Sequence, residues 1–191
     1  MNLPCDQCAT SCCKKYTVFL SAFDIFRLWN GTNILLLELV SFLPASKASG
    51  GFSPFAFSLG GKGRFLLTLR RNHGICAWWS ADNPGKHCTV HEFRPDDCRC
   101  YPFNLFHGQL KVAHQKICPT DWSLVTAFEK DFTSANQRKK TNFFQYQALL
   151  QTWHEEILPE LAGKCLSLSD KKGRFLSFFL TQTAQLKEIY S

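Results

Sequence analysis

The stretch CAWWSADNPGKHCTVHEFRPDDCRCYPF, from Cys76 to Phe103, holds four of the ten cysteines of this 191-residue chain. Cysteine thiolates are soft ligands that bind zinc or iron–sulfur clusters. Turn residues between these cysteines can bring several sulfurs to one point. We therefore expect this stretch to organise the fold, with the rest of the chain as its support. The spacing within the stretch does not by itself identify a metal.

A second group of thiols lies near the start of the chain, where Cys5, Cys8, Cys12 and Cys13 follow one another closely. Cys5 and Cys8 have the C-x-x-C spacing that chelates one ion from a tight turn. Cys12 and Cys13 are adjacent and point in different directions, so they either serve two sites or one of them serves packing. A loop so rich in thiols should take its shape from what the sulfurs bind.

Length and composition predict one folded domain over residues 1–191, with a cysteine-cluster part at 1–120 and a helical part at 121–191. Hydrophobic residues make up 45% of the chain and 18 residues are phenylalanine, which indicates a packed globule rather than disorder. The formal charge of +7 attracts acidic partners or a membrane surface only weakly, because metal-bound thiolates would cancel part of it. A nucleic-acid-binding face is therefore the less economical interpretation, and no partner is identified.

The cysteines favour metal or redox chemistry in the cytoplasm over structural disulfides. The first residues lack the basic-then-apolar order of a secretory signal. The longest apolar run, Ile34 to Pro44, is too short to span a membrane. In a reducing compartment, closely spaced cysteines are typical of metal sites. The alternative is a secreted scaffold in which the even number of cysteines pairs as disulfides.

The residue pattern predicts an α+β fold in which small antiparallel hairpins and ligand loops surround the cysteine cluster and pack against several helices. β-branched and aromatic residues indicate the strands, and Gly-rich or His-Gly turns indicate the hairpins. The expected strands are residues 16–20, 52–59 and 64–69, followed by a hairpin over 104–114 that turns at His107 and Gly108.

Helix signals are clearest at Ser21, which can cap a helix together with Asp24, and at Gly31, which should end it. This helix should pack over the loop that carries the clustered cysteines. Further helices are expected at residues 33–43, from 120 or 121 to 132, at 142–158, and from Ser169 onward. We interpret the C-terminal helices as a scaffold rather than a cofactor groove.

Residues next to the cysteines could support a metal centre. Trp78 and Trp79 either shield a cluster from water or are ordinary core aromatics. Arg94 with Pro95 should fix the backbone before Cys98, and Arg99 can donate hydrogen bonds to sulfur or to backbone oxygens. Nearby histidines are interpreted as hydrogen-bonding or surface residues, although one could replace a cysteine ligand: His73, His87, His91, His107 and His114.

Taken together, the C-x2-C-x3-CC array, Cys76, the run HCTVHEFRPDDCRCYPF and Cys118 resemble the YkgJ-type cysteine-cluster family, whose members are described as zinc- or iron-chelating. Residues 94–103 match its R-P-x-x-C-R-x-Y-P-F signature, and residues 88–91 match the C-x-[IV]-[YH]-like segment that precedes this signature in the family. The gap between Cys8 and the next pair is one residue longer than in the compact form of the family. The resemblance implies eight metal ligands, with Cys100 and Cys165 as extra cysteines: Cys5, Cys8, Cys12, Cys13, Cys76, Cys88, Cys98 and Cys118.

Three functions remain open from the sequence. The first is a metal-binding protein that holds an iron–sulfur cluster, most simply 4Fe-4S, or zinc, in a structural or redox role; unequal loops and aromatic surroundings favour iron–sulfur. The second is an iron–sulfur-dependent enzyme resembling flagellin lysine methylases, although the chain has no nucleotide, paired-carboxylate or nucleophile motif. The third is a zinc-stabilised interaction module, supported only by the charge and the aromatic residues.

Overall fold

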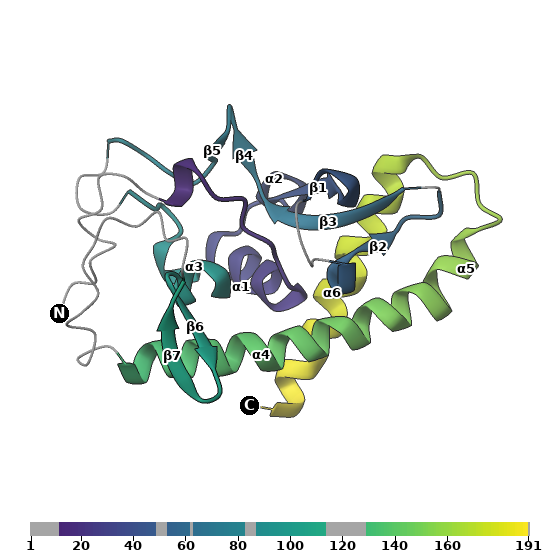
Figure 1. Cartoon of the computed structure of the whole chain (residues 1–191). Helices are drawn as coiled ribbons and strands as arrows, with labels where there is room; N and C mark the ends of the chain where they lie inside the picture. The colour runs from purple at the N-terminus through teal and green to yellow at the C-terminus, as the bar shows by residue number, and fades with distance from the viewer. Residues whose placement is uncertain (1–11, 49–52, 62, 83–86, 114–128, 191) are drawn as a thin grey trace.

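The computed structural model describes residues 12–48, 53–61, 63–82, 87–113 and 129–190. These residues form the predicted α+β mixture of helices and small antiparallel sheets. In Figure 1 the short elements that carry the cysteines gather at one end of the molecule, around α3 and β4–β5. The C-terminal helices extend toward the opposite end, where α5 lies.

Helix α1, Ala22–Thr32, begins with the capping box that the sequence predicts. The Ser21 backbone N–H donates to Asp24 Oδ2 over 2.9 Å, and the Asp24 backbone N–H donates to Ser21 Oγ over 3.3 Å. Two of the N–H groups at the start of the helix therefore have partners. The helix ends one residue beyond Gly31, where Asn33 adopts the left-handed conformation.

The predicted helix over residues 33–43 is wrong in its second half. Helix α2 covers only Leu36–Leu39, and the chain continues as strand β1, Val40–Pro44. β1 pairs antiparallel with β3, Arg64–Leu69, which also pairs with β2, Phe57–Ser58, so that the strand order is β1-β3-β2. The partner strand outweighs the local helical preference, since an isolated apolar run does not reveal what lies beside it.

The other predicted strands have mixed outcomes. The expected strand at residues 16–20 forms only an isolated bridge between Phe19 and Thr68. The expected strand at residues 52–59 is reduced to β2, preceded by a 3-10 turn. The hairpin after Cys100 is confirmed, because His107 and Gly108 have φ angles of 49° and 78° at its turn. The remaining short elements are η2, Cys12–Lys14; η3, Ala45–Lys47; η4, Ser53–Phe55; β4, Arg71–Asn72; β5, Ile75–Cys76; η5, His91–Phe93; α3, Asp96–Cys100; β6, Phe103–Phe106; and β7, Gln109–Val112.

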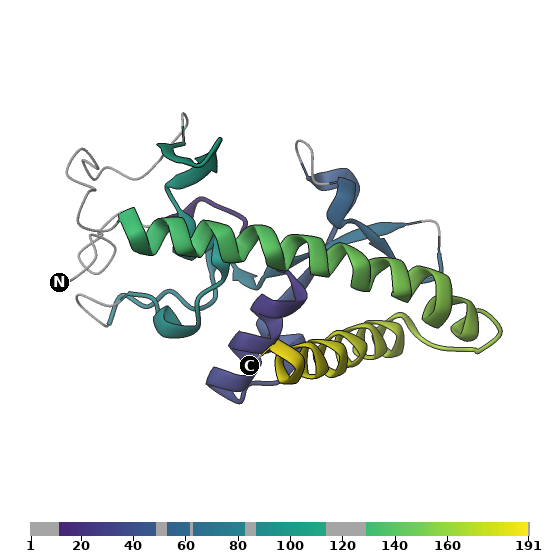
Figure 2. The same cartoon turned by 90° about the horizontal axis from the view of Figure 1, so that it is seen from below.

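The C-terminal part consists of α4, Glu129–Thr152, a π-helical turn η7, Trp153–Ile157, α5, Leu158–Leu161, and α6, Leu168–Tyr190. A predicted break between residues 132 and 142 is wrong, because α4 runs through without a glycine or proline. The predicted helix start at residues 120 or 121 lies outside the described residues. Ser167 rather than Ser169 caps α6, since its Oγ hydrogen-bonds Asp170. Seen from below, α4 and α6 are the two long helices of the molecule (Figure 2).

No helix in the described part of the chain combines the length and the apolar character needed to cross a membrane.

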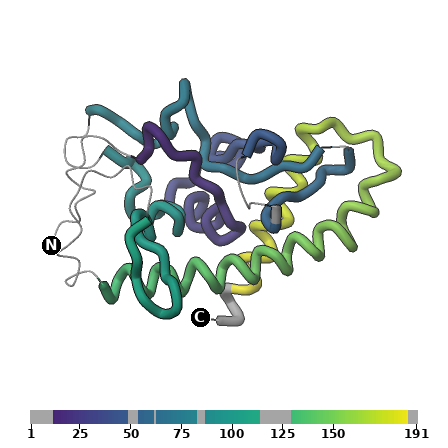
Figure 3. Tube along the Cα trace, viewed as in Figure 1, coloured from purple at the N-terminus to yellow at the C-terminus, as the bar shows by residue number. Residues whose placement is uncertain are grey.

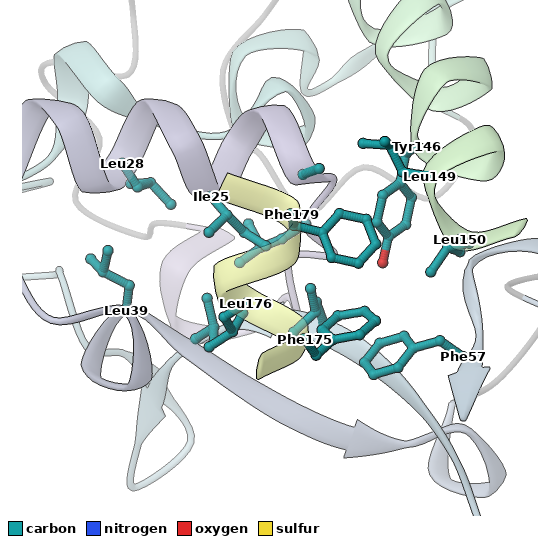
Figure 4. Close-up of a cluster of buried hydrophobic side chains, with 14 of the residues drawn as sticks. Ile25, Leu28, Leu39, Phe57, Tyr146, Leu149, Leu150, Phe175, Leu176 and Phe179 are labelled. Carbon is teal, nitrogen blue, oxygen red and sulfur yellow. The ribbon is translucent and has the colours of Figure 1, made fainter. Parts of the chain in front are cut away.

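The buried core lies where α4, η7 and α6 meet the three-stranded sheet and α1 (Figure 4). The Phe175 ring stacks on Phe57 at 3.9 Å between ring centres and lies 4.9 Å from Trp153. The Trp153 indole N–H donates to the Ser58 carbonyl over 2.9 Å, and the Ser58 N–H donates to His154 Nε2 over 3.0 Å. Aromatic burial and two hydrogen bonds therefore hold the helices to the sheet.

Candidate metal centre

Five of the predicted ligands are described, and they come from four separate places in the chain. Cys12 and Cys13 lie in η2, Cys76 ends β5, and Cys88 follows the loop after β5. Cys98 lies in α3. The thiols of Cys76, Cys88, Cys98, Cys100 and Cys165 are free. The disulfide alternative therefore finds no support at these five cysteines.

Four of the predicted ligands interact with one another, with Cys13 as their common neighbour. A hydrogen bond between the Cys76 and Cys13 side chains is the main cause that raises the pKa of the Cys76 thiol, and burial adds to it. Burial raises the pKa of the Cys98 thiol well above its ordinary value, and the charges of Cys13 and Cys88 raise it further. Sulfurs from widely separated segments are thus close enough to influence each other's ionisation.

The described sulfurs do not form a closed coordination site. Among the described residues, no group of three or more Cys, His, Asp or Glu side chains is arranged so that it could hold a metal ion. The thiols are instead neighbours with raised pKa values, one pair of which is hydrogen-bonded. Three predicted ligands, Cys5, Cys8 and Cys118, lie outside the described residues.

Arg71 ties the segment of Cys12 and Cys13 to the hairpin that carries Cys76. Its guanidinium donates to the backbone carbonyls of Tyr16 and Lys14 on one side and of Gly74 on the other. Because Arg71 pairs with Cys76 across β4 and β5, this side chain sets the distance between the two cysteine segments. Sequence reasoning missed Arg71, since nothing near it marks a backbone-binding arginine.

Helix α1 holds the start of α3, and therefore the position of Cys98. Asp24 Oδ1 accepts a 2.8 Å hydrogen bond from the Asp96 N–H, the first residue of α3. Arg27 forms a 3.0 Å ion pair with Asp96 and donates to the Arg94 carbonyl over 3.0 Å. Burial and the neighbouring Asp96 raise the pKa of Asp24 to about 6, against the opposing charge of Arg27. The sequence marked Asp24 only as a helix cap.

The loop between Cys88 and Cys98 packs closely on α1, as expected from the sequence. A Cβ at Gly31 would overlap the Phe93 ring, so only glycine allows this approach of α1 to η5. Arg99 donates through Nε to the Arg94 carbonyl over 3.0 Å and also bonds the Glu92 carbonyl. Of the two roles predicted for Arg99, donation to backbone oxygens is therefore the one observed.

Hydrogen-bond donors surround the thiols. The Trp78 backbone N–H bonds Cys76, and the Val90 backbone N–H bonds Cys88; both contacts favour the thiolate and lower the pKa. The Arg94 charge lowers the pKa of both Cys88 and Cys98. In each case burial acts in the opposite direction. N–H donors and a positive charge beside sulfur suit a metal-bound thiolate, since outer hydrogen bonds orient ligands and tune the bound metal.

The two extra cysteines differ from this set. Cys100 is buried in α3, and burial is the main cause that raises its pKa to about 12, while the Lys139 charge opposes it. Cys165 is exposed between α5 and α6, away from the cluster.

The described histidines contact other groups. His87 stacks on Trp79 at 5.8 Å between ring centres, and a ring nitrogen of His91 contacts Arg94. His73 and His107 occupy turns with positive φ. His114 lies outside the described residues. Among the described residues, no metal-binding group of three or more side chains forms around a histidine.

Two adjoining cavities lie beside α3, and the smaller one reaches Cys98. The smaller, about 280 Å³, is lined by Cys12, Cys98 and Cys100 together with Tyr16 and Tyr101. The larger, about 580 Å³, lies between α1, α3, α4 and the β6–β7 hairpin. Phe19, Asp97, Asn104 and Lys139 line both cavities.

Comparison with known proteins yields one match. A family model described as "CxxCxxCC: Putative zinc- or iron-chelating domain" covers residues 4–122, more than half of the chain. This range contains the described thiols of Cys12, Cys13, Cys76, Cys88 and Cys98. No curated protein and no solved structure is similar enough to this chain to count as a match.

Proposed function

Since the chain belongs to this zinc- or iron-chelating family, we propose that it binds a metal centre through thiolates and that the centre is part of its folded structure. The ligands in this proposal are Cys5, Cys8, Cys12, Cys13, Cys76, Cys88, Cys98 and Cys118.

The observation that supports the proposal most directly is the shared neighbourhood of Cys13. The thiols of Cys76, Cys88 and Cys98 each respond to the charge of Cys13. While they are protonated, thiols that lie close together gain little free energy from one another. A bound metal ion replaces their protons and makes the same arrangement favourable, because metal binding and folding share one free energy.

The surrounding residues fit such a centre. The backbone N–H groups of Trp78 and Val90 donate to sulfur, and Arg94 places a positive charge beside Cys88 and Cys98. These groups offset the negative charge that thiolates keep when they bind a metal. When bound, an iron–sulfur cluster would supply electron transfer, whereas zinc would supply structural support.

An iron–sulfur cluster, most simply of the 4Fe-4S type, is the centre we favour over zinc. The proposed ligands come from loops of unequal length rather than from paired short knuckles. Trp78, Trp79, Cys13 and Cys88 are all partly buried and pack against the hydrophobic core. Burial of this kind stabilises clusters that carry electrons and sets their potentials.

Anaerobic purification with elemental analysis and a visible spectrum tests the metal, and two cysteine variants test the site. Cys98→Ala is expected to lose most of the metal and to lower the melting temperature, because a missing ligand removes part of the folding free energy. Cys165→Ala is the matched control, since this thiol is exposed and lies outside the cluster. It should keep the metal content of the unmodified protein.

Equal metal content in the two variants would overturn the assignment of Cys98. Iron with sulfide and a broad visible absorption would support the cluster. Zinc without visible absorption would support the structural alternative and would remove the redox role.

An enzyme is the second candidate function, and one observation favours it. The cavity of about 280 Å³ beside Cys12 and Cys98 offers a small molecule access to the proposed centre. A purely structural site is closed, whereas a catalytic one keeps an accessible position. If added cyanide changes the visible spectrum of the metal-loaded protein, the centre is open to ligands. An unchanged spectrum would count against the enzyme.

A further inference from the structure

Two buried hydrogen-bond donors beside the thiols have no acceptor. The indole Nε1 atoms of Trp78 and Trp79 are both shielded from water, and neither donates a hydrogen bond to any described residue. Leaving a buried donor unpaired costs about 1–3 kcal/mol. Such groups are rare in folded proteins, and two neighbouring ones call for an acceptor that the described residues do not supply.

The backbone pairs Trp79 with Cys88 and Trp78 with the next residue, Thr89. Trp79 and Cys88 form an antiparallel bridge, and the Thr89 N–H donates to the Trp78 carbonyl over 2.9 Å. The chain therefore doubles back on itself with Cys76 on one arm and Cys88 on the other. Both tryptophans therefore lie on the arm of Cys76, next to the arm of Cys88.

Trp79 also contacts residues that flank two of the proposed ligands. Lys14, which follows Cys13, lies over the Trp79 ring with its Nζ 4.2 Å from the ring centre. On the other arm, His87, which precedes Cys88, stacks on the same indole. Trp79 is thus held between residues adjacent to two of the proposed ligands. The faces of its ring are engaged, while its N–H edge is the part without a partner.

We propose that the indole N–H groups of Trp78 and Trp79 donate hydrogen bonds to sulfur of the bound metal centre and so set its affinity and reduction potential. This inference rests on the proposed metal site. Metal-bound sulfur carries negative charge and accepts N–H hydrogen bonds, as Cys76 and Cys88 already do from backbone N–H groups. The tryptophans are positioning residues, because they act on the metal only through its ligands.

The direction of the change in reduction potential follows from the negative charge of the metal centre. An N–H donor stabilises the form of the centre that carries more negative charge, which is the reduced form of an iron–sulfur cluster. Removing a donor should therefore lower the reduction potential. For any metal, losing an outer hydrogen bond to a ligand typically weakens binding about 10–100-fold.

The test compares Trp78→Phe, Trp79→Phe and the double variant with the unmodified, metal-loaded protein. Trp29→Phe is the matched control, because this tryptophan lies in α1 outside the cysteine hairpin and is 39% exposed. Metal content is measured first. The dissociation constant of the metal and, for an iron centre, its potential are then measured. We expect an affinity loss of about 10-fold or more in each hairpin variant and no change in the control.

A second measurement reads the hydrogen bond directly. The protein is loaded with the NMR-active isotope of cadmium, a soft ion that thiolates bind, and its tryptophans are labelled with nitrogen isotope. A scalar coupling between cadmium and the Trp79 or Trp78 indole proton is expected only if the N–H donates to a metal-bound sulfur. Packing alone produces no such coupling, so this readout also separates a hydrogen bond from lost aromatic volume.

Cadmium bound without coupling to either indole, or hairpin variants with the affinity of the Trp29 control, would overturn the inference while the metal site stands. A protein that binds none of these metals would instead overturn the proposed function, and the inference with it. Coupling in the unmodified protein, lost in the matching Phe variant, supports it.

Discussion

The helical part of the molecule and its cysteine-bearing part are held together by different forces. Around α4, η7 and α6, the side chains of Tyr146, Trp153 and Phe175 are completely buried. Trp153 meets Phe175 edge to face, and the rings of Tyr146 and Phe175 both contact Phe179. Around η2, β5 and α3, the contacts between segments are mostly guanidinium groups bound to backbone carbonyls (Figure 3 shows the short, winding path of this end). The helical part depends mainly on aromatic burial, whereas the cysteine-bearing part joins the same core through side chains such as Val90 and Phe93 and adds these polar contacts.

This difference explains why the thiols sit where they do. A region of short elements buries too little apolar surface to offset the entropy of ordering its loops. Arg27, Arg71 and Arg99 hold the loops in place through backbone carbonyls. The thiols between these loops still cost stability while they are protonated and close to one another. A metal would remove that cost. Three contributions to stability can therefore be tested separately: the metal, aromatic burial, and the contact between the two parts.

Metal removal should have the largest effect, and only on the cysteine-bearing part. Thiolate metal sites contribute on the order of 10 kcal/mol of apparent binding free energy, which is lost when a chelator takes the ion. Hydrogen–deuterium exchange should show lost protection at residues 87–100, while residues 168–186 of α6 keep theirs. Equal protection with and without chelator would show that the cysteine-bearing part is stable without a metal.

Phe175→Ala should have the next largest effect, on the helical part. The ring is fully buried and touches Phe57, Trp153 and Phe179, so its removal leaves a cavity that costs about 3–5 kcal/mol. Denaturant unfolding should show this loss in both the metal-loaded and the chelated protein. Phe144→Ala is the matched control, because that ring on α4 is 57% exposed. A change there should stay within about 0.5 kcal/mol.

The same contrast decided which features could be predicted from the sequence. Local signals were sufficient where local contacts dominate: Ser21 and Asp24 form the predicted capping box, and His107 with Gly108 forms the predicted hairpin turn. The fold class and the family resemblance also followed from patterns of this kind. Cys76 and Cys88 lie close enough to Cys13 to respond to its charge, while their role as metal ligands stays a prediction.

Features that depend on a distant partner could not be predicted. Val40–Pro44 is a strand because β3 lies beside it, and nothing in that segment alone indicates this. Arg71 binds carbonyls of residues 14 and 16, which are remote in sequence. The role of Asp24 as acceptor for the Asp96 N–H joins residues 72 positions apart. Sequence reasoning finds the ligands more easily than the residues that hold them, because ligands have a characteristic spacing and supports do not.

The smallest predicted effect concerns the contact between α1 and the cysteine loop, where two helical glycines give a matched pair. Gly173 lies inside α6 and has open space around it, so Gly173→Ala should stabilise the protein by about 0.5–1 kcal/mol through helix propensity. Gly31 lies inside α1 against the Phe93 ring, and an added methyl group would displace that ring. Gly31→Ala should therefore destabilise by about 1–3 kcal/mol despite a similar gain in propensity.

Metal binding provides a second measurement on these two glycine variants, because Phe93 belongs to the loop between Cys88 and Cys98. If displacing the ring moves the loop, Gly31→Ala should also weaken metal binding, whereas Gly173→Ala should leave it unchanged. Thermal unfolding and metal titration on the same two variants measure both quantities. Should Gly31→Ala lose stability yet bind metal as the unmodified protein does, the helix supports the loop without positioning Cys98, and the placement of that ligand must come from the contacts of Asp24 and Arg27 with the start of α3.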